Sequence, residues 1–113
     1  MENELPKAKW KDRILYYLGR RRAFLVEGNS MAPALKSGAV VLIHRHAKIK
    51  SGDLVLAKHP YKSSVSILKR VAEIEPDGGL VLIGDNSLES TDSRTFGAVS
   101  IESIIGPVIC RLK

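Results

Sequence analysis

The segment SSVSILKRVAEIEPDGGLVLIGD, residues 63–85, decides the fold class of this 113-residue chain. Its first part alternates apolar and polar side chains with a period of two, which is the pattern of a half-buried β-strand. The sequence PDGG at residues 76–79 is a turn signal, and the aliphatic run LVLIGD follows it. The segment therefore predicts two strands separated by a turn.

Further strand-like runs lie on both sides of this segment and are bounded by turns that contain glycine or proline. They are AFLVEG (23–28), AVVLIHR (39–45), LVLAKHP (54–60) and SIIGPVICRL (103–112). Short β-runs at such spacing are typical of a mainly β domain or barrel. A chain of this length is expected to form one domain with a modest core.

Residues 7–22 predict a basic N-terminal helix, so we divide the domain into an arm (1–22) and a β core (23–113). Trp10, Ile14, Tyr17 and Leu18 share one helix face. We expect this face to pack on the domain and leave a solvated basic end. The alternative is that the helix docks an anionic partner or lipid headgroups.

The formal net charge of +6 favours an acidic partner, an anionic membrane or nucleic acid over a neutral surface, unless the charges are simply solvated. No apolar run approaches the roughly 18 residues that a membrane span needs, and the N-terminus lacks a signal-peptide pattern. We therefore expect a cytoplasmic protein without a transmembrane span. The single cysteine, Cys110, is expected to be a buried thiol in a strand.

Lys69 lies inside the apolar run VSILKRV, residues 65–71. Alternation places it on the same strand face as Val65, Ile67 and Val71. Burial among such side chains lowers the pKa of a lysine because it disfavours the charged form, and a neutral amine can act as a general base. The alternative is a lysine whose ammonium group reaches solvent at a sheet edge.

Ser30 lies in EGNSMAPAL, residues 27–35, between Gly28 and Pro33. Glycine allows a positive φ before the serine, and proline fixes φ after it. Such a turn would present the hydroxyl together with its backbone N–H, which can stabilise an oxyanion. A serine hydroxyl needs a base, and a neutral lysine serves as that base in Ser-Lys hydrolases. Taken alone, the stretch also fits a structural turn.

Four sequence boxes resemble those of type I signal peptidases and their relatives, and they occur in the family's order. They are GNSMAPAL (28–35), SGDLVLAKHP (51–60), ILKRV (67–71) and GDNSLESTDSRTFGAV (84–99). The resemblance implies a serine endopeptidase with Ser30 as nucleophile, Lys69 as general base and Ser90 as the hydroxyl that orients the lysine. It also implies supporting residues: Gly28 and Asn29 before the nucleophile, Met31 and Pro33 beside the substrate groove, Gly84, Asp85 and Asn86 in a closing turn, and the charged pair Asp92 and Arg94.

The family resemblance also implies a mainly β, coiled-strand fold, a partly open barrel shared with self-cleaving repressors, and no metal or other cofactor. Three positions depart from the family pattern. Ala34 replaces a threonine, Ala39 replaces an aspartate, and Gly28 occupies the position where some members carry a serine that donates to the oxyanion. The second oxyanion donor therefore stays open.

The chain resembles most closely the small soluble members that mature nickel-type superoxide dismutase, which implies removal of an N-terminal propeptide from that enzyme's precursor. The alternative is a soluble or peripherally membrane-bound signal peptidase core that cleaves exported proteins. A self-cleaving repressor is less favoured, because the 29 residues before Ser30 leave no room for a helix-turn-helix domain. We expect a protein or peptide substrate and no nucleic-acid partner.

Three histidines suggest other chemistry, and none is favoured. His44 and His46 are expected to share a face of one strand, but two histidines without a third ligand make a poor metal site. His59 would need a carboxylate to orient it in a catalytic triad, and the sequence singles out none. Asp53 is expected to have a structural role in the turn before a strand.

Overall fold

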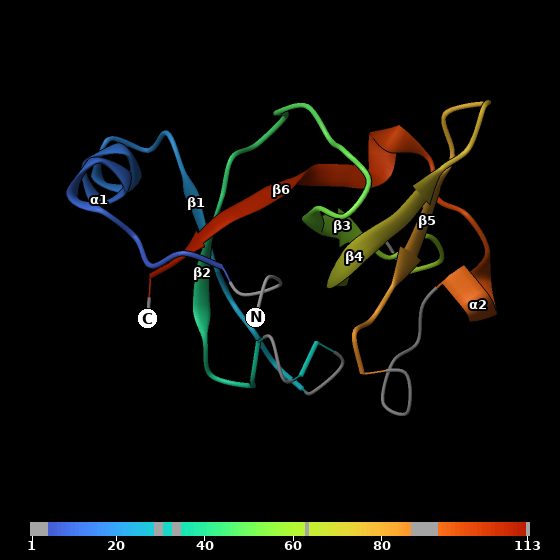
Figure 1. Cartoon of the computed structure of the whole chain (residues 1–113), viewed down its shortest axis with the longest axis horizontal. Coiled ribbons are helices and arrows are strands. Elements are labelled where there is room, and N and C mark those ends of the chain that lie inside the picture. Colours follow the sequence, from blue (N-terminus) through green and yellow to red (C-terminus); the bar gives the residue numbers. More distant parts are fainter. Residues whose placement is uncertain (1–4, 29–30, 33–34, 63, 87–92, 113) are drawn as a thin grey trace.

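The computed structural model describes residues 5–28, 31–32, 35–62, 64–86 and 93–112. Within these ranges the chain forms one antiparallel sheet with the strand order β1-β2-β6-β3-β4-β5 and short helices at its margins (Figure 1). The mainly β prediction is therefore confirmed. The strands are β1 (Arg22–Leu25), β2 (Val40–Ile43), β3 (Leu54–Lys58), β4 (Ser66–Ile74), β5 (Leu80–Ile83) and β6 (Ile104–Arg111); the helices are α1 (Trp10–Tyr17), α2 (Ser93–Phe96) and a 3₁₀ turn, η2 (Ile101–Ser103).

The segment that predicted the fold class forms β4, a turn and β5. The two strands pair antiparallel, with Ile74 opposite Leu80. The turn closes through a hydrogen bond from the Glu75 N–H to the Gly79 carbonyl at 2.7 Å. The Asp77 carboxylate also accepts a hydrogen bond of 2.9 Å from the Gly79 N–H, which the pairing of β4 with β5 does not use.

Strand β6 joins the two halves of the sheet. Its C-terminal part pairs with β2, where Cys110 lies opposite Leu42, and its N-terminal part pairs with β3, where Gly106 lies opposite Leu56. The Gly-Pro pair at 106–107 does not interrupt the strand. Pro107 lacks an N–H, but its carbonyl still accepts the N–H of His44 at 3.1 Å.

The core consists of two apolar clusters on opposite faces of β3. Leu54 and Leu56 belong to the first, together with residues of β2 and the buried Met31 and Leu35. Val55 and Ala57 belong to the second, together with residues of β4 and β5. Because successive side chains of a strand point to opposite faces, β3 is buried on both sides and reads as a continuous apolar run.

Helix α1 is shorter than the predicted 7–22 and is oriented differently from the expectation. It ends at Tyr17, Gly19 adopts a φ of 77°, and Arg22 already belongs to β1. The apolar residues Trp10, Ile14, Tyr17 and Leu18 are all exposed, so the expectation that this face packs on the domain is wrong. The helix contacts the domain through its other side, where Asp12 and Leu15 are half-buried. No helix among the described residues is long and apolar enough to span a membrane.

Cys110 is a buried strand residue, as predicted, with 2% of its surface exposed. Burial raises the pKa of its thiol to about 11, and the nearby Asp12 carboxylate adds to the increase. Both effects disfavour the thiolate, so the residue is an inert packing group at neutral pH.

Gly106→Ala should lower the free energy of unfolding, because a Cβ at this position would meet the carbonyl oxygen of His44 and lie 3.0 Å from the Arg45 Cα. We expect a loss of about 1–3 kcal/mol or more, measured by urea denaturation. Gly78→Ala is the comparison: its Cβ would meet open space, and only its φ of 92° opposes the change. A loss for Gly106→Ala no larger than that for Gly78→Ala would contradict the crowding argument.

Candidate active site

Lys69 is buried in the middle of β4, with 4% of its surface exposed. It pairs with Val55 of β3 and alternates with Ile67 and Val71, both of which pack in the second apolar cluster. The predicted apolar face is therefore confirmed for Ile67, Lys69 and Val71, whereas Val65 precedes β4 and is 43% exposed. In the described part of the chain, Lys69 is the one charged residue that is buried to this degree.

Lys69 lines a cavity of about 170 Å³ that brings together three separate parts of the chain. One wall comes from β1 and the residues directly after it, another from β4, and a third from Met31. The lining residues are Phe24, Val26, Glu27, Met31, Ser66, Ile67, Leu68 and Lys69. A cavity of this size accepts one small or medium side chain of a substrate, with an amine in its wall.

Met31, which follows Ser30 in the chain, is tied to the turn after β5. Its side chain is buried, and its sulfur accepts the backbone N–H of Asp85 at 3.4 Å. Asp85 in turn binds the guanidinium of Arg70 through two parallel hydrogen bonds, Nε to Oδ1 and Nη2 to Oδ2, each of 2.9 Å. The position next to the predicted nucleophile is thereby linked to the strand that carries the predicted base.

Arg70 is a supporting residue that the sequence reasoning missed. The predicted charged pair was Asp92 with Arg94, and Asp92 lies outside the described residues. Among the described residues, an ion pair joins Arg70 to Asp85. Arg70 also donates from Nη1 to the Gly52 carbonyl at 2.9 Å. The sequence could have indicated this role. Alternation along β4 places Arg70 on the same strand face as the apolar Leu68, and a cation at the border of the core needs a charged or polar partner.

The remaining predicted site residues fall into two groups. Gly28 adopts a φ of 83°, as its place before the serine predicted, and its N–H donates to the Ser37 hydroxyl at 3.3 Å. Gly84 is buried, Asn86 is half-buried and Arg94 is exposed on α2. Asn29, Ser30, Pro33, Ser90 and Asp92 lie outside the described residues.

Helix α2 is fastened to the sheet at both ends. The hydroxyl of Ser93 accepts the backbone N–H of Leu82 at 2.8 Å, and Phe96 packs against the second apolar cluster. Phe96 also contacts the ring of His59 edge-on, with 5.3 Å between the ring centroids. The chain that follows Ser90 and Asp92 in sequence is therefore held against β5.

None of the three histidines has the surroundings that its alternative role would require. The Nδ1 atom of His59 accepts the Tyr61 N–H at 3.1 Å, so it is not available to donate to a triad carboxylate. β2 ends at Ile43, and His46 adopts a φ of 63° in the following turn. The expectation that His44 and His46 share a face of one strand is therefore wrong.

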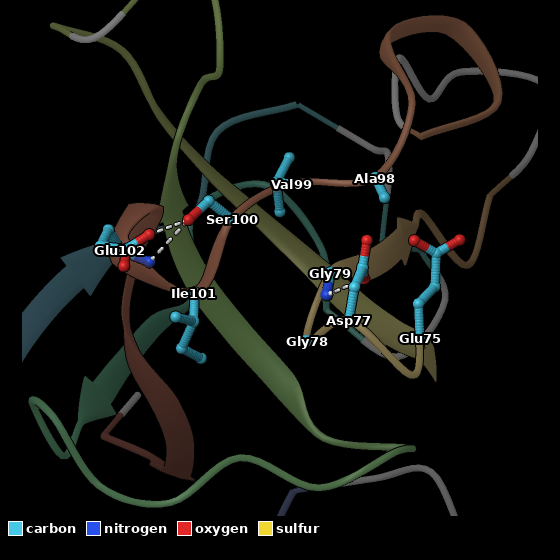
Figure 2. Close-up of a pocket in the computed structure, with 9 residues that line it drawn as sticks. All are labelled: Glu75, Asp77, Gly78, Gly79, Ala98, Val99, Ser100, Ile101 and Glu102. Carbon is cyan, nitrogen blue, oxygen red and sulfur yellow. Dashed lines mark hydrogen bonds between the residues drawn. The ribbon is translucent and has the colours of Figure 1, made fainter.

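A second cavity, of about 370 Å³, lies between the β4–β5 turn and residues 98–102 (Figure 2). Glu75 and Asp77 face it from the turn, and Ser100 and Glu102 from the other wall. The Ser100 hydroxyl donates to the Glu102 carboxylate and lowers its pKa. None of the predicted site residues lines this cavity, so the candidate active site is the cavity that holds Lys69.

Comparison with known proteins identifies the family of the chain. The profile of the family described as Peptidase S24-like matches residues 7–109. The mitochondrial inner membrane protease subunit 1 of Xenopus tropicalis is 34% identical over 119 aligned residues, which cover 85% of this chain and 70% of the relative. The mitochondrial ATP-independent inner membrane protease subunit 1a of Arabidopsis thaliana is 33% identical, with 77% and 67% covered. Subunit 2 of the inner membrane protease of Danio rerio is 34% identical, with 72% and 58% covered.

Asp85→Asn and Arg70→Gln should each lower the free energy of unfolding by about 1–3 kcal/mol, because each leaves the other partner half-buried without its ion pair. Urea denaturation of both variants and of the double variant would give their coupling energy. Glu73→Gln, an exposed carboxylate on the same strand, is the control and should change stability by less than about 0.5 kcal/mol. If the loss of unfolding free energy in the double variant equalled the sum of the two single losses, the interaction between Arg70 and Asp85 would be refuted.

Proposed function

Because the chain belongs to the Peptidase S24-like family and is a serine-type, signal peptidase I-like peptidase, we propose that it cleaves peptide bonds with a Ser30–Lys69 dyad. One observation carries the proposal: Lys69 is buried in the wall of a cavity that Met31, the residue after Ser30, also lines. A lysine buried in the wall of a cavity is in the environment that a lysine general base requires.

The proposed reaction has two steps. Ser30 Oγ attacks the scissile carbonyl carbon while the neutral amine of Lys69 takes the hydroxyl proton, and the backbone N–H of Ser30 stabilises the oxyanion. The protonated Lys69 then gives its proton to the leaving amine, and the C–N bond breaks to form an acyl-enzyme. The same amine takes a proton from water as the water oxygen attacks the ester carbonyl carbon. When the C–Oγ bond breaks, the protonated amine returns this proton to Ser30 Oγ and the carboxylic acid is released.

We propose that the substrate binds as an extended segment beside β1, which is an edge strand of the described sheet. The N–H and C=O groups of Val26 are both used within the domain, by the Ala39 carbonyl and the Gly38 N–H. Because backbone groups alternate in direction along an antiparallel strand, those of Leu25 point to the open edge. Leu25 would therefore supply the main-chain bonds, while Phe24 and Val26 line the cavity.

For the substrate class, we favour the N-terminal segments of exported proteins, because the relatives reported above are membrane proteases of the signal-peptidase type. The precursor of nickel superoxide dismutase is the second candidate, and it rests on the sequence resemblance alone. Co-expression with a precursor of each kind, followed by N-terminal sequencing of the products, separates the two.

Ser30→Ala and Lys69→Met should each lower the rate of precursor cleavage by on the order of 10³-fold or more, because each removes one half of the dyad. Methionine retains much of the volume of the buried lysine, so folding should survive, as circular dichroism would check. Lys58→Ala changes an exposed lysine on the neighbouring β3 and serves as the control, with cleavage at the normal rate. Near-normal cleavage by either dyad variant would refute the proposed roles.

Cleavage should also rise with pH, since only the neutral amine of Lys69 can accept the serine proton. Burial disfavours the charged amine, so the midpoint of the kcat/KM profile should lie well below lysine's usual value of about 10.4. The measurement is a pH series of cleavage rates on one peptide, with folding checked at each pH. A midpoint at the value of an exposed lysine would show that Lys69 is not the base.

A further inference from the structure

One face of α1 displays large apolar side chains to solvent. Trp10 is 67% exposed, Ile14 49%, Tyr17 92% and Leu18 69%. They follow the spacing i, i+4, i+7 and i+8, so they form one continuous stripe, which we call the outer face of α1. Four exposed apolar side chains in one stripe mark a contact surface rather than scattered exposure.

Basic side chains border the outer face. Lys11 and Arg13 flank it within the helix, both exposed, and the Lys11 ammonium lies 5.6 Å from the centre of the Trp10 ring. Residues 5–22 hold seven lysines and arginines and one acidic residue, Asp12. Asp12 is half-buried on the side of the helix that contacts the domain. The outer face is therefore apolar along its centre and positive at its edges.

The domain holds α1 in place from its N-terminal side. The Ala8 N–H donates to the Arg111 carbonyl at 2.8 Å, and the Arg111 N–H donates to the Pro6 carbonyl at 2.9 Å. This short parallel pairing fixes the start of the helix beside the end of β6, and Figure 1 shows α1 to one side of the sheet. The outer face is thus presented by an anchored helix, which reduces the entropy lost on binding.

We propose that the outer face of α1 docks the protein on an anionic lipid surface. Tryptophan and tyrosine favour the boundary between headgroups and acyl chains, and lysine and arginine favour anionic headgroups. A nucleic acid would satisfy the basic residues but leave the apolar stripe in water. An anionic lipid surface meets both requirements within the width of one helix, and it would bring the peptidase to substrates at a membrane.

Trp10 makes the proposal directly testable, because it is the only tryptophan in the chain. The full-length protein is titrated with vesicles of phosphatidylcholine alone and of equal parts phosphatidylcholine and phosphatidylglycerol. We expect a blue shift of the emission with the anionic vesicles and little change with the neutral ones. Roughly 1 M salt, which shortens the Debye length to about 3 Å, should reverse most of the binding.

Paired variants separate the two contributions in a vesicle sedimentation assay. Tyr17→Ser with Leu18→Ser should weaken binding at least about tenfold through lost apolar area. Lys11→Gln with Arg13→Gln should weaken binding to anionic vesicles about tenfold. Tyr61→Ser is the control: Tyr61 is 77% exposed and lies outside the helix, so binding should not change.

All of these variants should cleave a soluble peptide at the normal rate, which separates a failure of docking from a failure of the proposed peptidase activity. Unchanged Trp10 emission with anionic vesicles would overturn the proposal, and so would an equal loss of binding in Tyr61→Ser. A blue shift that grows with protein concentration without lipid would instead assign the outer face to a second copy of the chain. A stronger shift with duplex DNA than with vesicles would assign it to nucleic acid.

Discussion

The antiparallel pairing of β3 with β4 is the constraint on which the rest of the molecule depends. It places Lys69 opposite Val55, on the face that holds the second apolar cluster, and Leu68 opposite Leu56, on the other face. A slip of one residue would move Lys69 to the opposite face and exchange the two sets of side chains. The buried position of this amine is therefore a consequence of strand register, and the register is itself held by burial on both sides of β3.

The candidate active site depends on a second constraint, the chain of contacts from Arg70 through Asp85 to Met31. The ion pair joins the strand of Lys69 to the turn after β5, and the Asp85 N–H joins that turn to the Met31 sulfur. Contacts of this kind fix a nucleophile segment relative to its base, and a displacement of about 1 Å can cost two orders of magnitude in rate. Helix α2, fastened through Ser93 and Phe96, holds the chain after Asp92 against β5.

The basic character of the chain has a local origin. Residues 5–22 hold seven basic residues and one acidic residue, so their net charge equals the +6 of the whole chain, and they surround a helix whose apolar residues are exposed instead of packed. The two apolar clusters contain none of the exposed residues Trp10, Ile14, Tyr17 and Leu18, although Leu5 of the arm packs against the first cluster. The core therefore buries Lys69, whereas the arm presents the apolar and basic surface for which we propose a lipid partner.

The alternating pattern of residues 65–71, the PDGG turn and the four ordered boxes were enough to predict a mainly β peptidase, the buried face of Lys69 and the positive φ of Gly28. They could not show that Arg70 pairs with Asp85, because these residues come together only when β4 and β5 fold back on each other. The spacing of Trp10, Ile14, Tyr17 and Leu18 defined an apolar face, but not whether it turns inward or outward. The spacing of apolar residues within one helix or strand is a local property and can be read directly from the sequence. The partner of a charge and the direction of an amphipathic face depend on which distant surfaces meet, and only the tertiary structure decides that.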